Sequence, residues 1–571
     1  MGKHADNIMA DLLVDYGVEA VFGVPGGQTL PLYYGILDRG DRIRHVLMRD
    51  EINAAYAADA YARVSGKIGV CDATAGCGSI KFVSGLAEAY NSSIPVIAIA
   101  SEMNHDWITV RYRGCGPQMT DSKGVLAPVT KWTATLPTTD TMAELVQRAA
   151  QMATGGRPGP VFIECPWKLF KDEYTGPEPK ADPKLANLPS YRPVPGLEDI
   201  DAAIRLLLDA KRPLILAGGG CWLSGARDEL TALAERTGTP VATTLSGKGI
   251  LQENHPLSLG VLSGLGGNPA SEKAAMQADL IFAVGFKSSA NATFNWKLPL
   301  AGQRMIHLDI DPMELNKMRV ADVAMLGDAK ASLGVLLSRL PADCPKHDAA
   351  PAEALKKAWA KDRAEEAGEA DPIRPQQVVS VLNEVCGDNT ILVCDASFSC
   401  GWGGTFFDVY GKRRALFPRG NAGLGYGLPG GVGAAAARPD STVVVLTGDG
   451  GLSYCLGEMA TLREQGMNVK VVVLNNAILG WIKWYEAAIW KGRFTEVDTE
   501  RVAFDQVARG LGCKGYALRN TATLRKDLAA VFAEKGPAVI DIATSELCAC
   551  KFHDKEEAVQ AMERSYRSKQ G

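Results

Sequence analysis

The 571-residue sequence lacks the features that mark membrane, secreted and nucleic-acid-binding proteins. No stretch reaches 18 uninterrupted apolar residues, and the first residues show no signal-peptide pattern. Lysine and arginine number 61 against 65 aspartates and glutamates, so the net charge of -4 gives no basic surface for nucleic acid. Thirteen cysteines, an odd number scattered along the chain, do not resemble a disulfide framework. We therefore expect a cytoplasmic protein with no membrane and no nucleic-acid partner.

Histidine is scarce, and the common phosphate-binding loop is missing. The chain has 7 histidines, and none lies beside the motifs described below except His45 and His105. The GxxxxGK[ST] pattern of nucleoside-triphosphate-binding loops is absent. The chemistry of this chain therefore has to come from other residue types.

The overall composition is that of an ordinary soluble globular protein, with 46% hydrophobic and 22% charged residues. Apolar, β-branched runs alternate with helical patterns in three segments, which predicts α/β domains with doubly wound parallel sheets. A proline-rich stretch and a charged, alanine-rich stretch separate them. The predicted order is domain 1–170, linker 171–196, domain 197–340, linker 341–375, domain 376–547 and a polar tail 548–571.

The most specific motif lies in the third segment. Residues 441–447 predict a buried strand that runs into Gly448-Asp449-Gly450, and residues 468–474 predict a second strand that runs into Asn475-Asn476. A helical pattern over 454–465 lies between them, so the strands should be parallel and should end at one edge of the sheet. A carboxylate and an amide oxygen at that edge suit Mg²⁺. Ordinary turns are the alternative, because Asp-Gly and Asn-Asn both favour them.

The GDG motif, its spacer and the closing Asn-Asn resemble the fingerprint of thiamine-diphosphate (ThDP) enzymes. The resemblance covers residues 1–547 and implies a pyrimidine-binding, a middle and a diphosphate-binding domain, in that order. It implies that Asp449, Asn476 and the main-chain oxygen of Ile478 hold the Mg²⁺ that anchors the cofactor's diphosphate. Further cofactor contacts are expected at Gly448, Gly450, Gly451 and Ile478.

One more segment of the third domain matches this family, and another departs from it. Leu424, in Gly423–Pro429, falls where a bulky apolar residue lies beneath the thiazolium ring and bends the cofactor. The alternative is that Leu424 only fills the core. Ser397, in Asp395–Ser399, can donate to the diphosphate, although this pentapeptide departs from the family's usual sequence.

In the first segment, Asp50 is a plausible N-cap for a helix over 52–64, and Glu51 stands in its first turn. A glutamate there can simply complement the helix dipole. The resemblance instead implies that Glu51 activates the cofactor by hydrogen bonding to a ring nitrogen of the pyrimidine. Such a carboxyl group usually lies in an apolar pocket that raises its pKa, and the alanine-rich helix agrees with that.

Three loops of the same segment supply the other expected contacts. Gly26 and Gly27 follow a strand, and Gln28 after them is expected in the substrate pocket. Thr74 and Gly76 belong to a loop that matches the family's Thr-Ser-Gly-Pro-Gly, with Cys77 in place of the proline. Gln118 aligns with a family glutamine near the reacting carbon, and a solvated loop glutamine is the alternative. The candidate site residues of the first domain are thus Gly26, Gly27, Gln28, Glu51, Thr74, Gly76 and Gln118.

Beyond the metal motif, Trp481 and Tyr485 belong to an aromatic cluster. The resemblance places them in the substrate pocket, whereas packing or a subunit contact is the alternative. In the tail, Cys548, Cys550 and His553 could suggest zinc, but no fourth ligand lies nearby, which favours free thiols.

The middle segment has a nucleotide-domain pattern: three apolar runs, over 214–217, 280–284 and 305–310, end in glycines or acidic residues. It resembles the middle domain of acetolactate synthases, which holds FAD. Lys287 stands where an arginine is expected, so an ADP or coenzyme A moiety, or no ligand, are the alternatives.

Together these features predict a ThDP- and Mg²⁺-dependent enzyme, a carboligase or lyase acting on a 2-keto acid or a related carbonyl substrate, similar to acetolactate synthase. A 2-hydroxyacyl-CoA lyase or an oxalyl-CoA-type decarboxylase is the alternative, and a non-catalytic paralogue is a third. The family implies a homodimer or homotetramer whose active sites lie at the subunit interface.

Overall fold

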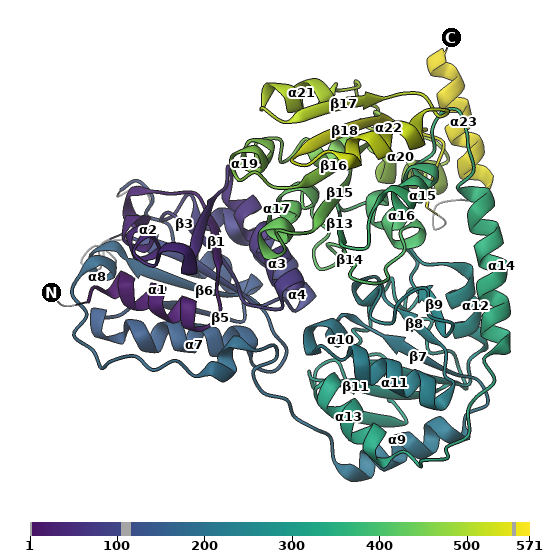
Figure 1. The fold of residues 1–571 in the computed structure, drawn as a ribbon, viewed down its shortest axis with the longest axis horizontal. Helices are drawn as coiled ribbons and strands as arrows, with labels where there is room; N and C mark the ends of the chain where they lie inside the picture. Colours follow the sequence, from purple (N-terminus) through teal and green to yellow (C-terminus); the bar gives the residue numbers. More distant parts are fainter. Residues whose placement is uncertain (1–2, 104–115, 551–555, 571) are drawn as a thin grey trace.

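A computed structural model describes residues 3–103, 116–550 and 556–570. They form three six-stranded sheets, each flanked by helices (Figure 1). Every strand pair with an assigned register is parallel, which confirms the predicted α/β class. Among the described helices, none combines the length and the apolar character needed to cross a membrane.

The first sheet has the strand order β2-β1-β3-β4-β6-β5. Val21 and Val70 point to the face covered by α1 and α7, whereas Phe22 and Cys71 point to the face covered by α3 and α4. This alternation along buried strands gives the doubly wound arrangement. The elements are α1 (Ala5–Asp15), β1 (Ala20–Gly23), α2 (Leu30–Leu37), β2 (Arg44–Leu47), α3 (Glu51–Ser65), β3 (Gly69–Ala73), α4 (Val83–Ser92), β4 (Val96–Glu102), α6 (Ser122–Leu126), β5 (Trp132–Thr135), α7 (Met142–Thr154), β6 (Val161–Pro166) and α8 (Trp167–Lys171).

The middle sheet has a different order, β12-β11-β10-β7-β8-β9, which is that of dinucleotide-binding folds. Ile215 packs against α9, α11 and α13, and Leu214 packs towards α12 on the other face. The elements are α9 (Leu197–Asp209), β7 (Pro213–Ala217), α10 (Gly219–Ser224), α11 (Arg227–Thr237), β8 (Val241–Thr243), β9 (Ser258–Val261), α12 (Pro269–Gln277), β10 (Leu280–Val284), β11 (Arg304–Asp309), β12 (Val323–Leu326) and α13 (Ala329–Arg339).

The third sheet, β14-β13-β15-β16-β18-β17, repeats the order of the first. The helix expected over 454–465 begins only at Glu458, because the chain after α18 first makes a turn. The elements are α15 (Pro375–Val385), β13 (Thr390–Cys394), α16 (Phe398–Phe406), β14 (Arg414–Leu416), α17 (Gly427–Ala437), β15 (Thr442–Gly448), α18 (Asp449–Leu452), α19 (Glu458–Glu464), β16 (Val469–Asn475), α20 (Gly480–Ile489), α21 (Phe504–Gly510), β17 (Lys514–Leu518), α22 (Leu524–Ala533) and β18 (Ala538–Ala543).

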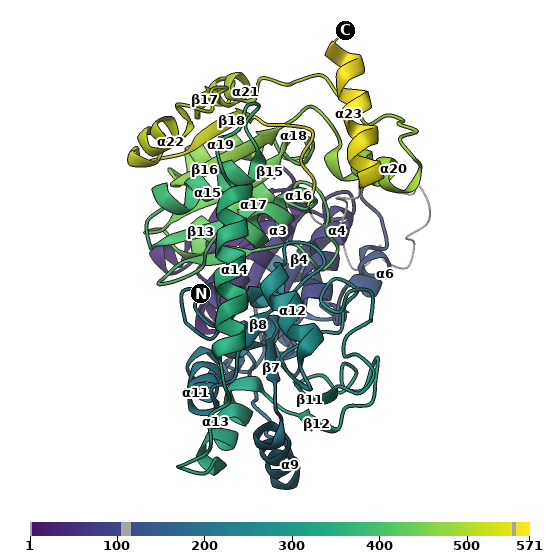
Figure 2. The ribbon, with the colours of Figure 1, turned by 90° about the vertical axis from the view of Figure 1, so that its right-hand side faces the viewer.

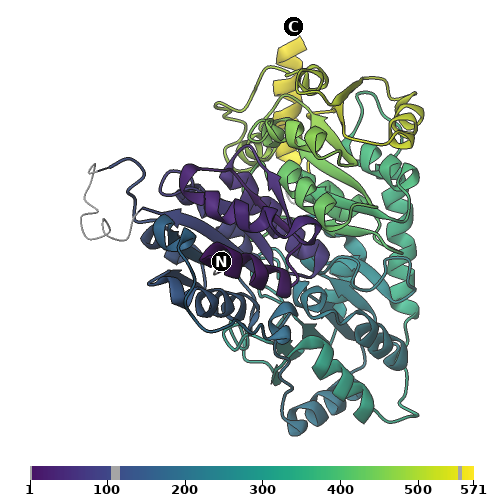
Figure 3. The ribbon, with the colours of Figure 1, turned by 60° about the vertical axis from the view of Figure 1, so that its left-hand side comes forward.

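The first and third domains share one hydrophobic core, formed where α3 packs on α17 (Figures 2 and 3). A Cβ atom at Gly433 would lie 2.0 Å from the main-chain oxygen of Ala57, so the two helices approach backbone to backbone. The Tyr426 hydroxyl donates to the buried Asp59 carboxylate over 2.8 Å. Small residues on both helices thus allow close packing between sheets that are far apart in the sequence.

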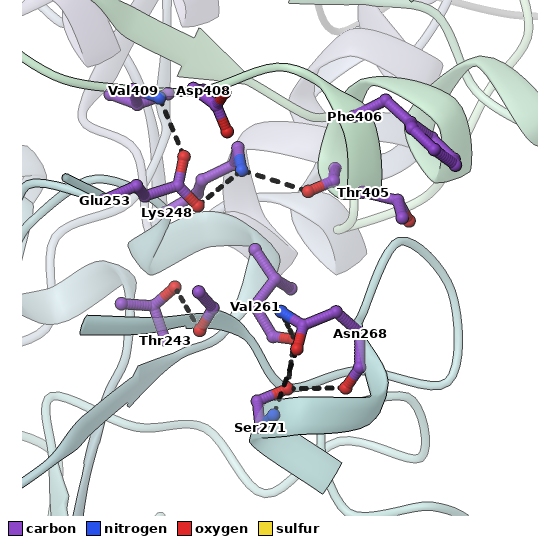
Figure 4. Close-up of polar contacts among 12 residues, drawn as sticks. Thr243, Lys248, Glu253, Val261, Asn268, Ser271, Thr405, Phe406, Asp408 and Val409 are labelled. Carbon is purple, nitrogen blue, oxygen red and sulfur yellow. Dashed lines mark hydrogen bonds and ion pairs between the residues drawn. The ribbon is translucent and has the colours of Figure 1, made fainter. Parts of the chain in front are cut away.

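A buried ion pair joins the middle and third domains (Figure 4). The Lys248 ammonium lies 2.6 Å from the Glu253 carboxylate and donates to the main-chain oxygen of Gly404 over 3.0 Å. The other carboxylate oxygen of Glu253 accepts from the Val409 N–H. Because both charges have partners from the neighbouring domain, they fix how the two domains meet.

Two helices lie outside the three sheets. Helix α14 (Ala350–Glu366) runs along the middle and third domains and has no fully buried residue, as expected for a solvated helix in the charged connector (Figure 2). The polar tail contains helix α23 (Glu556–Gln570), whose Ala558, Ala561 and Met562 are buried against the third domain, where α23 contacts α20. The tail is therefore a packed element rather than a solvated extension.

Candidate active site

Asp449 and Asn476 lie at one edge of the third sheet, as the motif predicted. Strand β15 ends at Gly448 and pairs in parallel with β16, which ends at Asn475. The Asp449 carboxylate accepts the N–H of Gly450 over 2.9 Å and the N–H of Ala477 over 2.6 Å. These bonds hold the loops after the two strands together, so the Asp449 carboxylate and the Asn476 loop are held at the same sheet edge.

The Asp449 carboxyl group suits a cation ligand. Burial raises its pKa, and the two backbone N–H bonds and the charge of Arg501 offset that only in part. A buried carboxylate gains most from a nearby cation, because little water screens the interaction. The donor set of one carboxylate oxygen and one amide oxygen, with the Ile478 backbone beside them, fits Mg²⁺ and the oxygens of a diphosphate.

A cavity of about 490 Å³ opens at this edge. Its lining residues come from residues 375–548, so no described residue of the first domain contributes. Trp481 lines it, but Tyr485, one turn further along α20 and 45% exposed, is not among the lining residues. Of the candidates, those that line the cavity are Ser397, Leu424, Gly448, Asp449, Gly450, Gly451, Asn476, Ile478 and Trp481.

Asp395 positions the loop that carries Leu424, a role that the sequence did not suggest. Its buried carboxylate accepts the N–H groups of Gly425 and Gly427 over 3.1 and 3.3 Å and the Thr447 hydroxyl over 3.0 Å. Burial raises its pKa, and these hydrogen bonds lower it. Leu424 remains 39% exposed on the cavity wall, so it is not core filling in this chain. An acidic residue directly after a buried strand was the available signal.

Three non-glycine residues around the cavity have positive φ angles. Ser397 has φ 69° and ψ -148°, a region that glycine alone adopts readily, and Ala422 and Ala477 have φ 55° and 56°. Ser397 and Ala422 line the cavity, and the Ala477 N–H donates to Asp449. Each such conformation costs on the order of 1–3 kcal/mol and persists where the surroundings impose it, most often at functional sites.

Glu51 opens α3 at the edge of the first sheet, and the Asp50 side chain caps the helix by accepting the Ile52 N–H over 2.9 Å. The Glu51 carboxylate is buried but not in the apolar pocket that the resemblance led us to expect, because the Lys81 ammonium lies 3.0 Å from it. A Cβ atom at Gly78 would lie 2.9 Å from the other carboxylate oxygen. Lys81 was missed because only the tertiary fold brings it to Glu51.

The other first-domain candidates form a connected network. The Thr74 hydroxyl donates to the Gln28 side-chain oxygen over 2.9 Å, and the Gln28 amide nitrogen donates to the Gln118 side-chain oxygen over 2.9 Å. The Gln118 amide nitrogen faces the Cys77 sulfur at 3.6 Å. Gln118 is thus not a solvated loop residue.

Glycines at 26 and 76 make room for this network. A Cβ atom at Gly26 would lie 2.3 Å from the Thr74 hydroxyl oxygen, and one at Gly76, whose φ is 61°, would lie 2.2 Å from the Gln118 main-chain oxygen. Gly27 has open space around it. The loops after β1 and β3, where the strand order reverses, therefore interlock with the segment around Gln118, at the usual position of ligand sites in open sheets.

Within one chain, the edge of the first sheet that carries Glu51 and the edge of the third sheet that carries Asp449 are linked by hydrogen bonds. They do not line one common cavity. Glu458, fully buried on α19, accepts the N–H of Arg49 over 3.0 Å and the Asn53 amide over 2.9 Å. These contacts lie at the start of α3, yet Glu51 is not among the residues that line the cavity of Asp449. A complete site with both groups cannot be assembled from this cavity alone.

A second cavity, of about 390 Å³, opens at the carboxyl ends of β7 and β10, where the strand order of the middle sheet reverses. Segments of the first and third domains also line it. Arg157 forms ion pairs there with Asp311 and Glu314, at 2.9 and 3.0 Å. The Lys287 ammonium donates to the Asn91 main-chain oxygen over 3.0 Å. Burial raises the pKa of Asp309, also in the lining, to about 7. The cavity is therefore polar, with groups of both charges.

The tail cysteines lie close to the active-site cavity, but the described residues give no support for a zinc site there. Cys548 lines the cavity and Cys550 is buried, while His553 lies outside the described residues. Within the described part of the chain, no group of three or more His, Cys, Asp or Glu side chains could hold a metal ion. The Asp449–Asn476 edge is a different kind of site, because an amide oxygen and a main-chain oxygen complete its donor set.

Comparison with known proteins agrees with this geometry. Three family models match: the N-terminal TPP binding domain of thiamine pyrophosphate enzymes over residues 3–123, their central domain over 200–336 and their C-terminal TPP binding domain over 395–542. An acetolactate synthase of Arthrospira platensis is 32% identical over 94% of this chain and 93% of its own length. An acetolactate synthase large subunit of Cyanidium caldarium is 30% identical over 95% and 93%. An acetolactate synthase of Mycobacterium leprae is 32% identical over 88% and 81%. The chain therefore belongs to the thiamine pyrophosphate enzymes, in the branch of the acetolactate synthases.

Proposed function

We propose that this protein is a ThDP- and Mg²⁺-dependent carboligase that joins a 2-keto acid to a second carbonyl compound, as the names of its relatives suggest. The single observation that carries the proposal is the paired edge of Asp449 and Asn476, bonded through the loops after β15 and β16 and opening on a cavity of about 490 Å³. A non-catalytic paralogue would have no need of a partly buried carboxylate there together with Glu51.

The residues at this edge would hold the cofactor. Asp449, Asn476 and the Ile478 main-chain oxygen would bind Mg²⁺, and the backbone of Gly448, Gly450 and Gly451 would approach the diphosphate. Leu424, exposed on the cavity wall, would support the thiazolium ring. When bound, the cofactor supplies the nucleophilic carbon and the electron sink.

We further propose that the site is completed by a second subunit in a homodimer or homotetramer. No described first-domain residue lines the cavity, so Glu51 of the same chain is poorly placed to meet a cofactor there. Glu51 of one subunit would exchange a proton with the pyrimidine of the cofactor held by the other. The Lys81 ammonium, 3.0 Å from that carboxylate, would hold it in position at the start of α3.

We propose the middle-domain cavity as a nucleotide site, with FAD the first candidate and an ADP or coenzyme A moiety the second. Its position at the β7–β10 switch point and its mixture of Arg157, Lys287 and Asp309 favour a ligand with phosphates and ribose hydroxyls. A yellow protein with absorbance near 450 nm would identify the flavin; a colourless one would favour the alternatives.

The test is subunit complementation. Glu51→Gln and Asp449→Asn are each expected to be inactive with pyruvate, ThDP and Mg²⁺. After co-expression and random pairing into dimers, half of the dimers are mixed, and in each of these one of the two sites keeps both native groups. Acetolactate formation should therefore return to about a quarter of the wild-type rate. Mixed samples without activity would reject the shared site, and wild-type protein inactive on every 2-keto acid would reject the carboligase proposal.

A further inference from the structure

The Gln28–Gln118 network has a direction, which depends on which side-chain atoms donate. Each carboxamide has one donating end and one accepting end, so turning one amide turns its neighbour. Gln28 places its nitrogen 2.9 Å from the Gln118 oxygen and 4.0 Å from the Met103 sulfur. A thioether sulfur can only accept a hydrogen bond. The end of the Gln28 amide that faces Met103 is therefore better filled by the NH₂ group than by the oxygen. The Thr74 hydroxyl then donates to the Gln28 oxygen.

The consequence falls on Gln118. With its oxygen occupied by Gln28, its NH₂ group points away from the network, towards Cys77 at 3.6 Å. The main chain of Gln118 is held close, because it lies against Gly76, and its φ of 66° is one that a non-glycine residue seldom adopts. Cys77 is exposed, so this end of the network faces the open edge of the first domain.

We propose that Gln28 and Thr74 are positioning residues that make Gln118 a hydrogen-bond donor to an oxygen of the substrate. Gln118 is the residue that touches substrate, and Gln28 acts only through it. The site would therefore select substrates that present an anionic or carbonyl oxygen at this point, such as the carboxylate or keto oxygen of a 2-keto acid. This substrate preference rests on the proposed function; the direction of the network does not.

Gln28→Glu is the sharpest way to reverse the network. A carboxylate accepts from both Thr74 and Gln118, so the Gln118 amide must turn its NH₂ group inwards and its oxygen towards Cys77. Cys77 reports this change without cofactor or substrate, since it is the exposed member of the described cysteines. A donor facing the sulfur stabilises the reactive thiolate, and an oxygen facing it does not.

The experiment is iodoacetamide labelling of the full-length, cofactor-free protein at pH 8, followed at the Cys77 peptide by mass spectrometry. Gln28→Glu should slow labelling at least threefold, and the neutral Gln28→Leu should slow it less. Both changes are then repeated in a Gln118→Ala background, where the reversal cannot be transmitted. Gln147→Glu, an exposed position on α7, controls for added charge in the same domain.

Each outcome decides the question. Slowing that largely disappears in the Gln118→Ala background supports the network. An equal effect in both backgrounds means that the new charge acts directly on the sulfur and overturns the proposal, as does no effect in either. If Gln28→Glu fails to fold, Gln28→Leu gives the same comparison without a buried charge.

Turnover separates this inference from the proposed function. With pyruvate as the probe, Gln28→Glu should raise KM at least fivefold, while hydrogen–deuterium exchange at the C2 carbon of bound ThDP stays within twofold of wild type. A purely structural defect would impair turnover and slow C2 exchange together. If the wild-type protein does not turn over pyruvate, the proposed function fails, whereas the labelling result still decides the direction of the network.

Discussion

The first and third domains have the same strand order, yet their sites are built from different chemistry. In both, the site lies where the order reverses, between β1 and β3 or between β13 and β15. In the first domain, two amide side chains and a hydroxyl group hydrogen-bond to one another, and the Glu51 carboxylate pairs with the Lys81 ammonium. The third holds the partly buried Asp449 carboxylate, which accepts two backbone N–H groups and whose pKa is raised by burial. Topology thus fixes the place of each site, and the loop residues fix what it can bind.

The comparison predicts that the first domain contributes to activation and the third to binding. Glu51→Gln should slow C2 hydrogen–deuterium exchange of bound ThDP by about 10²–10⁴-fold, the usual contribution of a positioned acid or base. Cofactor affinity, measured by titration calorimetry, should stay within a few-fold of wild type. Glu144→Gln, exposed on α7, is the control. Unchanged exchange would remove Glu51 from the activation step.

Asp449→Asn should have the opposite profile. Losing the charge that faces the cation should weaken Mg²⁺-dependent ThDP binding by about 2–5 kcal/mol, roughly 30- to several-thousand-fold. Calorimetric titration of ThDP at fixed Mg²⁺ measures this, and Asp440→Asn, exposed before β15, is the matched control. If Asp449→Asn bound ThDP normally but slowed C2 exchange, both domains would contribute to activation and the contrast between them would fail.

A pair of glycine variants tests how tightly the first site is built. Gly66 and Gly76 have φ angles of 70° and 61°, but only Gly76 has atoms within 4 Å of a new Cβ. Gly66→Ala should lower stability by about 1–3 kcal/mol, the cost of an unfavourable φ alone. Gly76→Ala should lose more stability than Gly66→Ala, as measured by thermal unfolding. It should also change the rate of Cys77 labelling. Equal losses of stability in the two variants would mean that the Gln118 loop moves easily to make room for the new Cβ atom.

The smallest effect concerns pH. Burial raises the Asp449 pKa above its ordinary 3.8, so without cation the folded state binds this proton more tightly than the unfolded state does. This group's contribution to stability therefore falls as pH rises from 3.8 through the raised pKa. Mg²⁺ requires the ionised form, so its affinity should rise over that window, by at most about tenfold per pH unit, and then level off. Mg²⁺ titrations between pH 4 and 8 should show this slope in wild type and none in Asp449→Asn.

Much of the fold and of the candidate site can be predicted from the sequence, because the patterns that determine them lie in short continuous segments. Buried strands are recognisable as short apolar runs, and a parallel βαβ unit must bring the ends of β15 and β16 to one edge, so Asp449 and Asn476 could be placed together. The N-cap residue Asp50 likewise placed Glu51 in the first turn of α3. These inferences need only neighbours in the sequence.

The remaining features depend on contacts between distant segments. Lys81 reaches Glu51 only once α3 and the following loop are folded, and Asp395 meets the Leu424 loop across about thirty residues of chain. Tyr485 lies outside the cavity because one turn of α20 separates it from Trp481. The late start of α19 follows from a turn that helical periodicity does not reveal.

The contact of Gly433 with Ala57 limits how this molecule can move. Two helix backbones in direct contact cannot slide without a clash, so the outer domains of one chain form a single stiff unit. The middle domain is tied to this unit as well, through the Lys248–Glu253 pair on the third domain and the ion pairs of Arg157 with Asp311 and Glu314. The three domains of one chain are therefore held together at every contact described above.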